Sequence, residues 1–312
     1  MKGLELARQY YETYGRPMLS EQFPDVADRI AVGLVGEGSE CLGFDDAVST
    51  DHDFEPGFCL FITKEDERQF GFRLERAYAK LPSAFCGFRR ERVSPVGGSR
   101  HGVMVIDDFY RKLLGAPCAP DTAERWLYTP SSALACASNG EVFRDDLGAF
   151  SAVRRQLLLG YPEEVMRKKL AAHTVFMAQA GQYNYERCMR HGEHGAAQLA
   201  MVEFVRHAVS AIYLLNGAYE PFYKWVYRGM DALSVLSELK NPLIALTELG
   251  NEPLEFESKR ETVEEIAAMF AAEFRRRHFS KVSENHLEQH AYAIQETIRD
   301  PNLRGMHIME GI

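Results

Sequence analysis

Hydrophobic positions along the first 140 residues follow two alternating patterns. Residues 30–35, 58–62 and 102–106 are short apolar runs bounded by glycine or polar residues, as in buried strands, and residues 52–54 belong to the second strand region. Residues 3–14 and 64–81 repeat apolar positions at helical spacing, with the first helix expected to end near Gly15-Arg16-Pro17. This alternation predicts an α+β fold in which helices cover a mixed sheet.

From about residue 148 onward, the apolar positions repeat almost only at helical spacing. The expected helices cover residues 149–159, 162–180, 181–191, 194–216, 220–238, 241–248, 261–277 and 283–299. The change in pattern lies near Ser138-Asn139-Gly140. We therefore expect two domains, an α+β domain over residues 1–140 and an all-α helical domain over residues 141–312.

The composition is that of an ordinary globular protein, with 46% hydrophobic and 26% charged residues among 312. Lysine and arginine number 36 against 45 aspartate and glutamate, so the formal net charge is −9. A field of this sign repels long polyanions, which argues against duplex DNA as a partner. A small anion held by a metal ion remains compatible with it.

The cysteines and the N-terminal residues point to the cytoplasm. Six cysteines are scattered without a C-x-x-C pair, which argues against a zinc ribbon or a dense disulfide framework and favours reduced thiols. The first residues carry charge throughout, and no stretch approaches the ~18 uninterrupted apolar residues of a membrane span. We expect a cytoplasmic protein with no membrane partner, while the oligomeric state stays open.

One polar segment joins the first two predicted strands and contains the most informative pattern. Gly38-Ser39 follows the first strand at the expected start of a short helix, and Asp51-x-Asp53 leads into the second strand. Unpaired N–H groups and a hydroxyl at a helix N-terminus favour phosphate oxygens. Side chains two residues apart on a strand share a face, so Asp51 and Asp53 can bind one Mg²⁺ or bracket two ions. A metal beside a phosphate-binding turn predicts phosphoryl or nucleotidyl transfer.

Acidic residues crowd this segment. Glu40, Asp45, Asp46, Asp51, Asp53 and Glu55 occur with no lysine or arginine between them. Such carboxylates repel one another unless cations are present, and a bound metal would relieve the repulsion. Asp45 and Asp46 follow a turn at Gly43 and are interpreted as structural or outer residues, whereas His52 points away from the Asp51/Asp53 face. The alternative is a polar loop that caps two strands without binding a ligand.

The Gly-Ser pair, the spacer and the D-x-D at a strand start resemble the signature of the polymerase-beta-like nucleotidyltransferase superfamily. Further segments resemble an uncharacterised bacterial nucleotidyltransferase family with a helical C-terminal domain, similar in layout to the aminoglycoside nucleotidyltransferases. These segments are Gly43-Phe44-Asp45-Asp46, Ser49, Asp51-His52-Asp53, residues 139–148, residues 181–185 and Tyr223-Lys224-Trp225. The similarity extends roughly from residue 30 to residue 230.

The resemblance implies a nucleotidyltransferase fold in the first domain. It also implies transfer of a nucleoside monophosphate from ATP or another NTP to an acceptor hydroxyl, with release of pyrophosphate. Carried over to this chain, Gly38 and Ser39 hold the triphosphate, and Asp51 and Asp53 hold Mg²⁺ and are catalytic. The superfamily has a third carboxylate on a later strand. Here Asp107 or Asp108 follows the third predicted strand, although either residue could equally cap a helix that begins at Phe109.

The departing pyrophosphate needs cations, and the acidic segment of the first domain supplies none, so we expect them from the helical domain. Lys224 is the first candidate, and Arg187, Lys169 and Arg190 are further ones. Tyr183 lies one helical turn before Arg187, and it or Trp225 is a candidate for stacking on the nucleotide base.

The leading hypothesis is a Mg²⁺-dependent nucleotidyltransferase that acts on a small molecule, a protein or an RNA. A second hypothesis is a catalytically silent nucleotide-binding module with a regulatory role, because a clear third carboxylate is missing. A third is an RNA-directed, helical ribonuclease-type partner domain, since Arg187 and His194 have the R-x(4–6)-H spacing of such domains. Gly192 between them would weaken a continuous helix.

Overall fold

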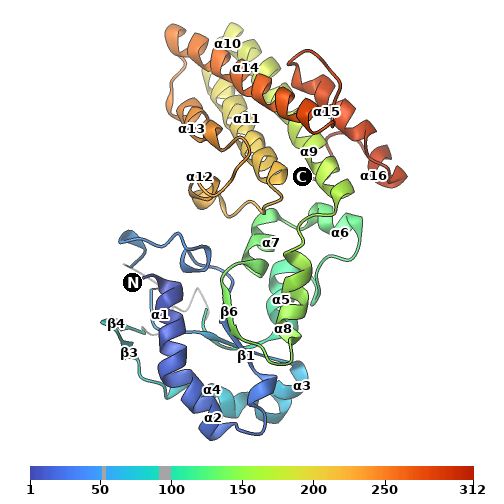
Figure 1. Cartoon of the computed structure of the whole chain (residues 1–312). Coiled ribbons are helices and arrows are strands. Elements are labelled where there is room, and N and C mark those ends of the chain that lie inside the picture. Colours follow the sequence, from blue (N-terminus) through green and yellow to red (C-terminus); the bar gives the residue numbers. More distant parts are fainter. Residues whose placement is uncertain (51–53, 91–99) are drawn as a thin grey trace. The chain divides into compact units, whose positions relative to one another are not determined.

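The computed structural model describes residues 1–50, 54–90 and 100–312, which form two compact units (Figure 1). The first unit contains Met1–Asp121 and Thr129–Leu159, and the helical unit contains Thr122–Tyr128 and Gly160–Ile312. The first unit continues beyond residue 140 because the strand that follows this residue pairs with the sheet.

A four-stranded mixed sheet forms the centre of the first unit, which confirms the predicted α+β class. Its strands are β1 (Ala31–Leu34), β2 (Cys59–Ile62), β5 (Gly102–Val105) and β6 (Glu141–Arg144), in the order β5-β2-β1-β6. β1 is antiparallel to β2 and β6, and β2 is parallel to β5. A separate hairpin pairs β3 (Ala84–Phe85) with β4 (Phe88–Arg89).

The strand register brings four chain segments to one end of this sheet. Gly33, near the end of β1, is opposite Cys59 at the start of β2, and Leu34 is opposite Glu141 at the start of β6. Cys59 is also opposite Gly102 at the start of β5. The residues after β1 and those before β2, β5 and β6 therefore meet at this end, which we call the site edge.

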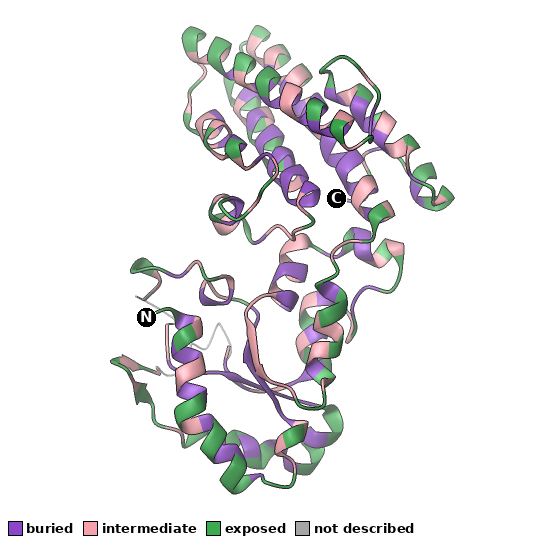
Figure 2. Ribbon diagram, in the orientation of Figure 1, coloured by how far each residue is buried: buried purple, intermediate pink, exposed green. Residues whose placement is uncertain are grey.

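Helices of the first unit pack on both faces of the sheet. They are α1 (Gly3–Tyr10), α2 (Arg16–Gln22), α3 (Lys64–Asp66), α4 (Phe72–Ala79), α5 (Ile106–Leu114), α7 (Ser131–Ser138) and α8 (Ala149–Leu157). Leu60 and Ile62 share a buried cluster with Tyr10 of α1. Phe61, on the opposite face, stacks on Phe150 of α8 with ring centroids 3.9 Å apart. Figure 2 shows β1 and β2 buried between these layers.

The first helix does not end near Pro17, as the sequence had suggested. A π-helical turn over Tyr11–Gly15 joins α1 directly to α2, which ends at Gln22. Pro17 has no N–H to donate in a regular helical hydrogen bond. The wider π-helical turn before it accommodates this proline, so the helix continues. Gly15 has a packing role here, because a Cβ on it would lie 2.5 Å from the ring of Phe58.

The helical unit is built only of helices and turns in the part of the chain that the structure describes. They are α6 (Ala123–Tyr128), α9 (Glu163–Met177), α10 (Tyr185–Arg190), α11 (His194–Leu215), α12 (Val226–Met230), α13 (Lys240–Glu248), α14 (Pro253–Arg276), α15 (Leu287–Glu296) and α16 (Pro301–Gly305). A π-helical turn over Ala178–Asn184 joins α9 to α10. The core gathers buried side chains such as Phe204, Ile212 and Phe270 from α11 and α14.

Two helices of this unit differ from the expected ones. The segment 220–238 contains a 3₁₀ turn at Tyr223–Trp225, the short α12 and the start of a second 3₁₀ turn, Ser237–Leu239. Gly229 leaves room for the hydroxyl of Tyr213, which a Cβ on this glycine would approach to 2.2 Å. α14 begins at Pro253 rather than near residue 261. Glu252 and Glu255 form a capping box at its start, which satisfies two N–H groups of the first turn.

Among the described residues, α11 is long and apolar enough to cross a membrane by length and composition. However, 56% of its apolar window is buried inside the unit, and α11 packs against α9 and α10. These are the features of a core helix.

Candidate functional site

A glycine-rich turn, residues 36–39, follows β1 at the site edge. Gly36 and Gly38 have φ values of +121° and +128°, a backbone conformation that favours glycine. A Cβ on Gly38 would lie 2.4 Å from Oε1 of Glu40, so the Glu40 carboxylate would have to shift to admit a side chain there. The predicted short helix is a single 3₁₀ turn over Glu40–Leu42. Any affinity for phosphate therefore comes from the N–H groups of the turn rather than from a helix dipole.

Ser39 stands at the start of the 3₁₀ turn and is half-buried. Its side chain makes no capping hydrogen bond, whereas its carbonyl accepts from the N–H of Leu42 and the N–H of Phe44 at 3.1 and 2.9 Å. The main chain of Ser39 is therefore fixed, and within the described residues its hydroxyl does not cap the turn.

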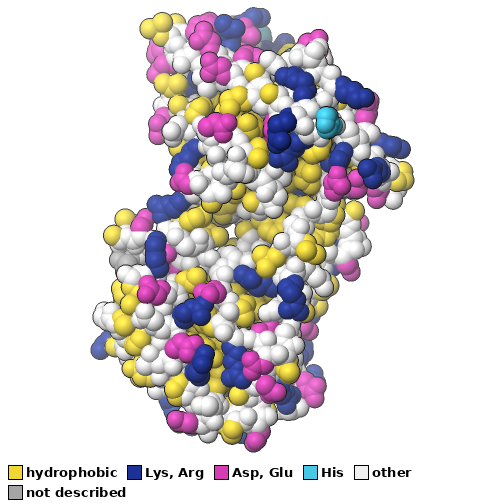
Figure 3. All heavy atoms as spheres, viewed as in Figure 1, with side chains coloured by type: hydrophobic (Ala, Val, Ile, Leu, Met, Phe, Trp, Pro, Cys, Tyr) yellow, Lys and Arg dark blue, Asp and Glu magenta, His cyan; other side chains and the backbone are white. Residues whose placement is uncertain are grey.

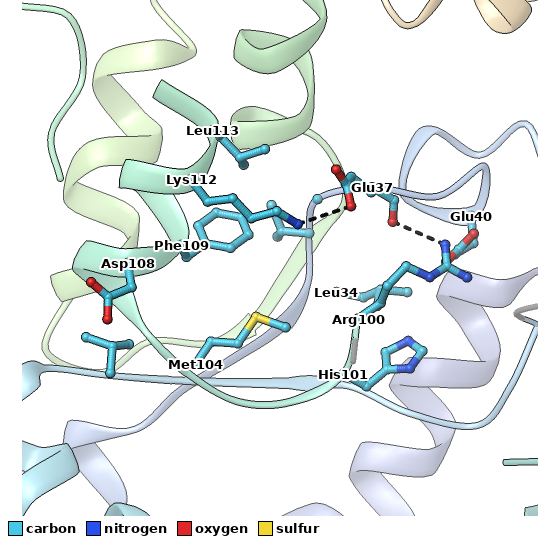
Figure 4. Close-up of a pocket in the computed structure, with 13 residues that line it drawn as sticks. Leu34, Glu37, Glu40, Arg100, His101, Met104, Asp108, Phe109, Lys112 and Leu113 are labelled. Atoms are coloured by element: carbon cyan, nitrogen blue, oxygen red, sulfur yellow. Dashed lines mark hydrogen bonds and ion pairs between the residues drawn. The ribbon is translucent and has the colours of Figure 1, made fainter. Parts of the chain in front are cut away.

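Two basic side chains of the first unit, Arg100 and Lys112, pair with acidic residues in or next to this turn (Figure 4). Arg100 pairs with Glu40 through NH1 and Oε1 at 3.3 Å, and the Nζ of Lys112 lies 3.3 Å from Oε2 of Glu37. The expectation that the first domain supplies no cation at the site was therefore wrong. Arg100 lies two residues before β5, and the parallel pairing of β5 with β2 brings it to the site edge.

The turn forms one wall of a pocket of about 290 Å³ between β5 and α5. Its apolar lining includes Leu34, Met104, Phe109 and Leu113, and its charged lining includes Glu37, Glu40, Arg100, Lys112 and Asp108. Figure 4 shows Arg100 and Glu40 at one end of this pocket and Asp108 at the other. The pocket therefore offers cations beside the glycine turn and an apolar wall beyond it.

Asp107, the predicted third carboxylate, and Asp108 belong to a helix rather than to a strand. β5 ends at Val105, and α5 begins at Ile106 rather than at Phe109, so both carboxylates lie in the first turn of α5 and are exposed. Acidic residues in a first helical turn are stabilised by the unpaired N–H groups there. Asp108 also lines the pocket and pairs with Arg111 at 2.7 Å.

The predicted metal ligands Asp51 and Asp53, with His52, lie outside the described residues. Phe54 follows them, and a Cβ on Gly3 would lie 3.0 Å from its ring and 2.6 Å from Cβ of Glu40. The neighbouring Glu55 lies 3.2 Å from Nδ1 of His101, just before β5. The described residues that follow the gap, Phe54 and Glu55, thus lie close to Glu40 and to His101 at the site edge.

No group of three or more His, Cys, Asp or Glu side chains among the described residues is arranged to hold a metal. The two aspartates would supply oxygen ligands, which suit Mg²⁺. The metal site stays a prediction from the sequence.

Asp45 and Asp46 have structural partners, in line with their interpretation from the sequence. The Asp45 carboxylate is buried and accepts from the N–H of Gly3 at 2.8 Å. Asp46 accepts from the N–H of Val48 at 3.0 Å and so caps the turn that follows it. These two acids fix the loop between the glycine turn and residues 51–53.

Two buried cysteines lie near the site edge. Burial raises the pKa of Cys59 to about 12 and also raises the pKa of Cys41. Both thiols are therefore protonated at neutral pH and are poor nucleophiles. None of the six cysteines, all of which belong to the described part of the chain, forms a disulfide.

The other predicted ligand-binding residues lie in the helical unit. Lys224 is exposed in the 3₁₀ turn at Tyr223–Trp225, with its Nζ 5.4 Å from the ring centroid of Trp225. Tyr183 and Arg187 are exposed neighbours, and NH1 of Arg187 donates to the Tyr183 hydroxyl at 3.3 Å. Their roles stay predictions.

Lys169 and Arg190 have other partners. Lys169 is buried and donates to the carbonyls of Leu127 and Gly311 at 2.7 and 2.9 Å, so it holds the helical unit together. Arg190 pairs with Glu186 one helical turn away, at 2.6 Å.

Comparisons with known proteins give limited similarity. Residues 126–226 match a domain family of unknown function, DUF4037. No curated protein matches the chain. The chain is also similar to a crystal structure of a nucleotidyltransferase-like protein from Exiguobacterium sibiricum, with 13% identity and a TM-score of 0.36, over 85% of this chain and 74% of that one. The assignment of a reaction therefore rests on the residues of this chain.

Proposed function

We propose that this protein is a Mg²⁺-dependent nucleotidyltransferase that transfers a nucleoside monophosphate, with ATP as the first nucleotide to test, to an acceptor hydroxyl and releases pyrophosphate. The observation that supports it most is the meeting of segments at the site edge. The turn at Gly38 and Ser39, the residues before β2 and the cation Arg100 all approach this edge.

In this proposal, different residues of the chain would bind the phosphates, neutralise the leaving group and hold the metal. The N–H groups of the glycine turn and the hydroxyl of Ser39 would bind phosphate oxygens, and Arg100 and Lys112 would neutralise the leaving pyrophosphate. Asp51 and Asp53 would hold the metal. A bound Mg²⁺ would stabilise negative charge on the phosphate that is transferred.

The acceptor and the nucleotide base are less defined. Asp108 lines the pocket and is a second candidate beside Asp107 for activating the acceptor hydroxyl. Lys224, Tyr183 and Arg187 are candidates for contacts to the nucleotide from the helical unit. The acceptor is a small molecule, a protein or an RNA, and the compartment is the cytoplasm in this proposal.

One observation favours the silent nucleotide-binding module as a second candidate. β5, the third strand of the site edge, reads Gly-Val-Met-Val and carries no carboxylate. A chain that binds nucleotide without a group to activate the acceptor would release no pyrophosphate.

The ribonuclease-type alternative gains no support. α10 ends at Arg190, and Gly192 has a φ of +72°, so Arg187 and His194 lie on different helices.

Labelled nucleotide tests the proposal directly. The full chain is incubated with Mg²⁺, α-³²P-labelled NTPs and panels of small hydroxylated molecules, proteins and RNA. We expect a labelled product that disappears in Asp51→Asn and Asp53→Asn and persists in Asp25→Asn, which changes an exposed aspartate outside the pocket. Nucleotide binding without label transfer to any acceptor supports the silent module instead, and activity of both site variants equal to the parent contradicts the proposal.

A further inference from the structure

The side chain of Asn139 binds the main chain of the glycine turn. Its Nδ2 donates to the carbonyl of Gly36 at 2.8 Å, and its Oδ1 accepts from the N–H of Gly36 at 2.9 Å. Asn139 lies between α7 and β6, two residues before the last pair of the β1–β6 ladder, Leu34 with Glu141. The side-chain amide of Asn139 therefore bonds Gly36 in the way that the main chain of a neighbouring strand would. It extends the hydrogen bonds of the β1–β6 ladder into the glycine turn.

The next residue binds the 3₁₀ turn that follows the glycine turn. The N–H of Gly140 donates to the carbonyl of Cys41 at 2.8 Å. Gly140 has a φ of +62°, and a Cβ on it would lie 2.0 Å from the carbonyl oxygen of Leu34. Only glycine therefore lets the main chain at residue 140 come this close to Leu34. Residues 139 and 140 thus fix the turn both before and after Gly38.

Arg154 supports this arrangement from α8. Its NH2 group donates to the carbonyls of Asn139 and Gly140, both at 3.1 Å. This guanidinium group is partly buried. It binds the main-chain carbonyl of Asn139, so the side chain of Asn139 can still bond Gly36. The dipeptide 139–140, fixed by Arg154, therefore adds to the hydrogen bonds that the turn makes through the Ser39 carbonyl.

The held turn leaves donors available for a ligand. Within the described parts of the chain, no main-chain or side-chain acceptor takes a hydrogen bond from the N–H of Glu37, Gly38 or Ser39. Successive N–H groups of this kind bind phosphate when their directions are fixed before the ligand arrives.

We infer that Asn139 is a positioning residue for nucleotide binding, which holds the N–H groups of residues 37–39 in the conformation that receives the phosphates. This inference rests on the proposed function, because the ligand it assumes is the nucleotide of that reaction. Asn139 itself does not touch the phosphates. Its effect passes through Gly36.

The chain offers a matched control in Asn216 of the helical unit. This side chain makes the same pair of bonds to Val235, donating to its carbonyl at 2.9 Å and accepting from its N–H at 3.0 Å. Both asparagines are half-buried. Asn216 also donates to the carbonyl of Ile212 and accepts from Ser234. Asn216→Ala therefore removes the same pair of bonds and further ones, away from the glycine turn, which makes it a demanding control.

Two measurements on the full chain test the inference. Hydrogen exchange reports the order of residues 36–41 without nucleotide, and calorimetric titration with ATP and Mg²⁺ reports affinity. We expect Asn139→Ala to raise exchange in residues 36–41 and to weaken ATP binding by about tenfold or more, since two hydrogen bonds are lost. Asn216→Ala should change neither quantity. Asn139→Asp, which keeps the acceptor and the side-chain volume, should act in the same direction and serves if the alanine variant does not fold.

The outcomes separate the two proposals. ATP binding by Asn139→Ala equal to the parent's, or unchanged exchange in residues 36–41, overturns the inference and leaves the proposed function intact. A parent chain that binds no ATP with Mg²⁺ overturns the proposed function and the nucleotide role of Asn139 together, while exchange still shows whether Asn139 orders the turn.

Discussion

The Nδ1 atoms of His173 and His207 lie 2.9 Å apart inside the helical unit. At this distance one ring donates an N–H to the other, so both rings can be neutral but not both charged. Burial lowers the pKa of His207 to about 4 and holds the pKa of His173 well below its usual value. Glu203, 3.4 Å from Nε2 of His207, opposes the shift, while Arg206 and Lys169 reinforce it.

We expect the helical unit to lose stability in acid. Below pH ~6.5 the unfolded chain protonates both histidines, while the folded chain protonates His207 only near pH 4 and resists protonation of His173 as well, so the free energy of unfolding falls as the pH falls over this interval, with about 1–3 kcal/mol from His207 alone. The chain's two tryptophans, Trp126 and Trp225, both belong to this unit, so their fluorescence during denaturant titration reports its unfolding.

A variant of the pair identifies the source of the pH dependence. His173→Phe removes one titrating ring, and we expect a smaller loss of stability between pH 7.5 and pH 4.5 than in the parent chain. His194→Gln, which changes an exposed histidine of α11, should keep the parental pH dependence. Equal slopes for the parent and His173→Phe would show that the buried pair does not control acid sensitivity.

The glycine turn predicts a contrast between two alanine substitutions in one loop. Gly38→Ala places a Cβ 2.4 Å from the Glu40 carboxylate at a φ of +128°, so Glu40 and the turn must move. Gly43→Ala also has a positive φ, of +72°, but nothing lies within 4 Å of its Cβ. We expect a cost of about 1–3 kcal/mol for strain at residue 38, and a cost near the lower end at residue 43.

Differential scanning calorimetry and ATP titration measure this contrast. Gly38→Ala should lower the melting temperature of the first unit and weaken ATP binding, and Gly43→Ala should keep ATP binding close to the parent's. If Gly38→Ala retains full affinity, the conformation of the turn does not matter for the nucleotide.

The strands with apolar runs were predictable, and the edge strand β6 was not. β1, β2 and β5 lie within the predicted segments because their residues are mostly buried and apolar. β6 reads Glu-Val-Phe-Arg, with a charged residue at each end, and all four residues are only partly buried, so its sequence lacks the apolar run.

The candidate site shows the same division. Gly38 and Ser39 were found because the chemistry of the turn is local in sequence. Arg100 and Lys112 were missed, since they contact Glu37 across 63 and 75 residues. Only the parallel pairing of β5 with β2 and the helix that follows β5 bring them there. The spacing of these residues in the sequence does not predict which strands pair.

A buried lysine predicts how the C-terminal segment is held. Lys168 is fully buried, and its Nζ donates to the carbonyls of His307 and Ile308 at 2.8 and 3.0 Å. Lys168→Met keeps an unbranched side chain, one atom shorter, but leaves these carbonyls without their donor. We expect the helical unit to lose about 2–4 kcal/mol of stability, because buried acceptors are left unsatisfied.

Tryptophan fluorescence during denaturant titration measures this loss, and hydrogen exchange should rise in residues 306–312. Lys281→Met, which removes an exposed lysine of the same unit, serves as the control and should change stability little. A Lys168→Met chain with parental stability and exchange would mean that water or a neighbouring group replaces the lysine at both carbonyls.

Finally, the charges around the glycine turn predict opposite effects of two neutral substitutions. Arg100 and Lys112 each pair with a carboxylate of the turn, so a nucleotide phosphate must compete with Glu40 and Glu37 for these cations. Arg100→Gln removes a cation, and we expect ATP affinity to fall by about tenfold, the worth of one charge-assisted hydrogen bond. Glu37→Gln removes a competitor, so affinity should rise, because the ammonium group of Lys112 becomes available.

Titrations of ATP at two ionic strengths measure both effects, and the difference between the parent and Arg100→Gln should shrink at high salt. Arg76→Gln on α4, an exposed arginine outside the pocket, makes the same change in net charge and should leave affinity close to the parent's. If Arg76→Gln weakens binding as much as Arg100→Gln does, the effect comes from net charge rather than from a cation at the turn. If Glu37→Gln weakens binding, the carboxylate supports the phosphate site instead of competing with it, and Lys112 must then be positioned by Glu37.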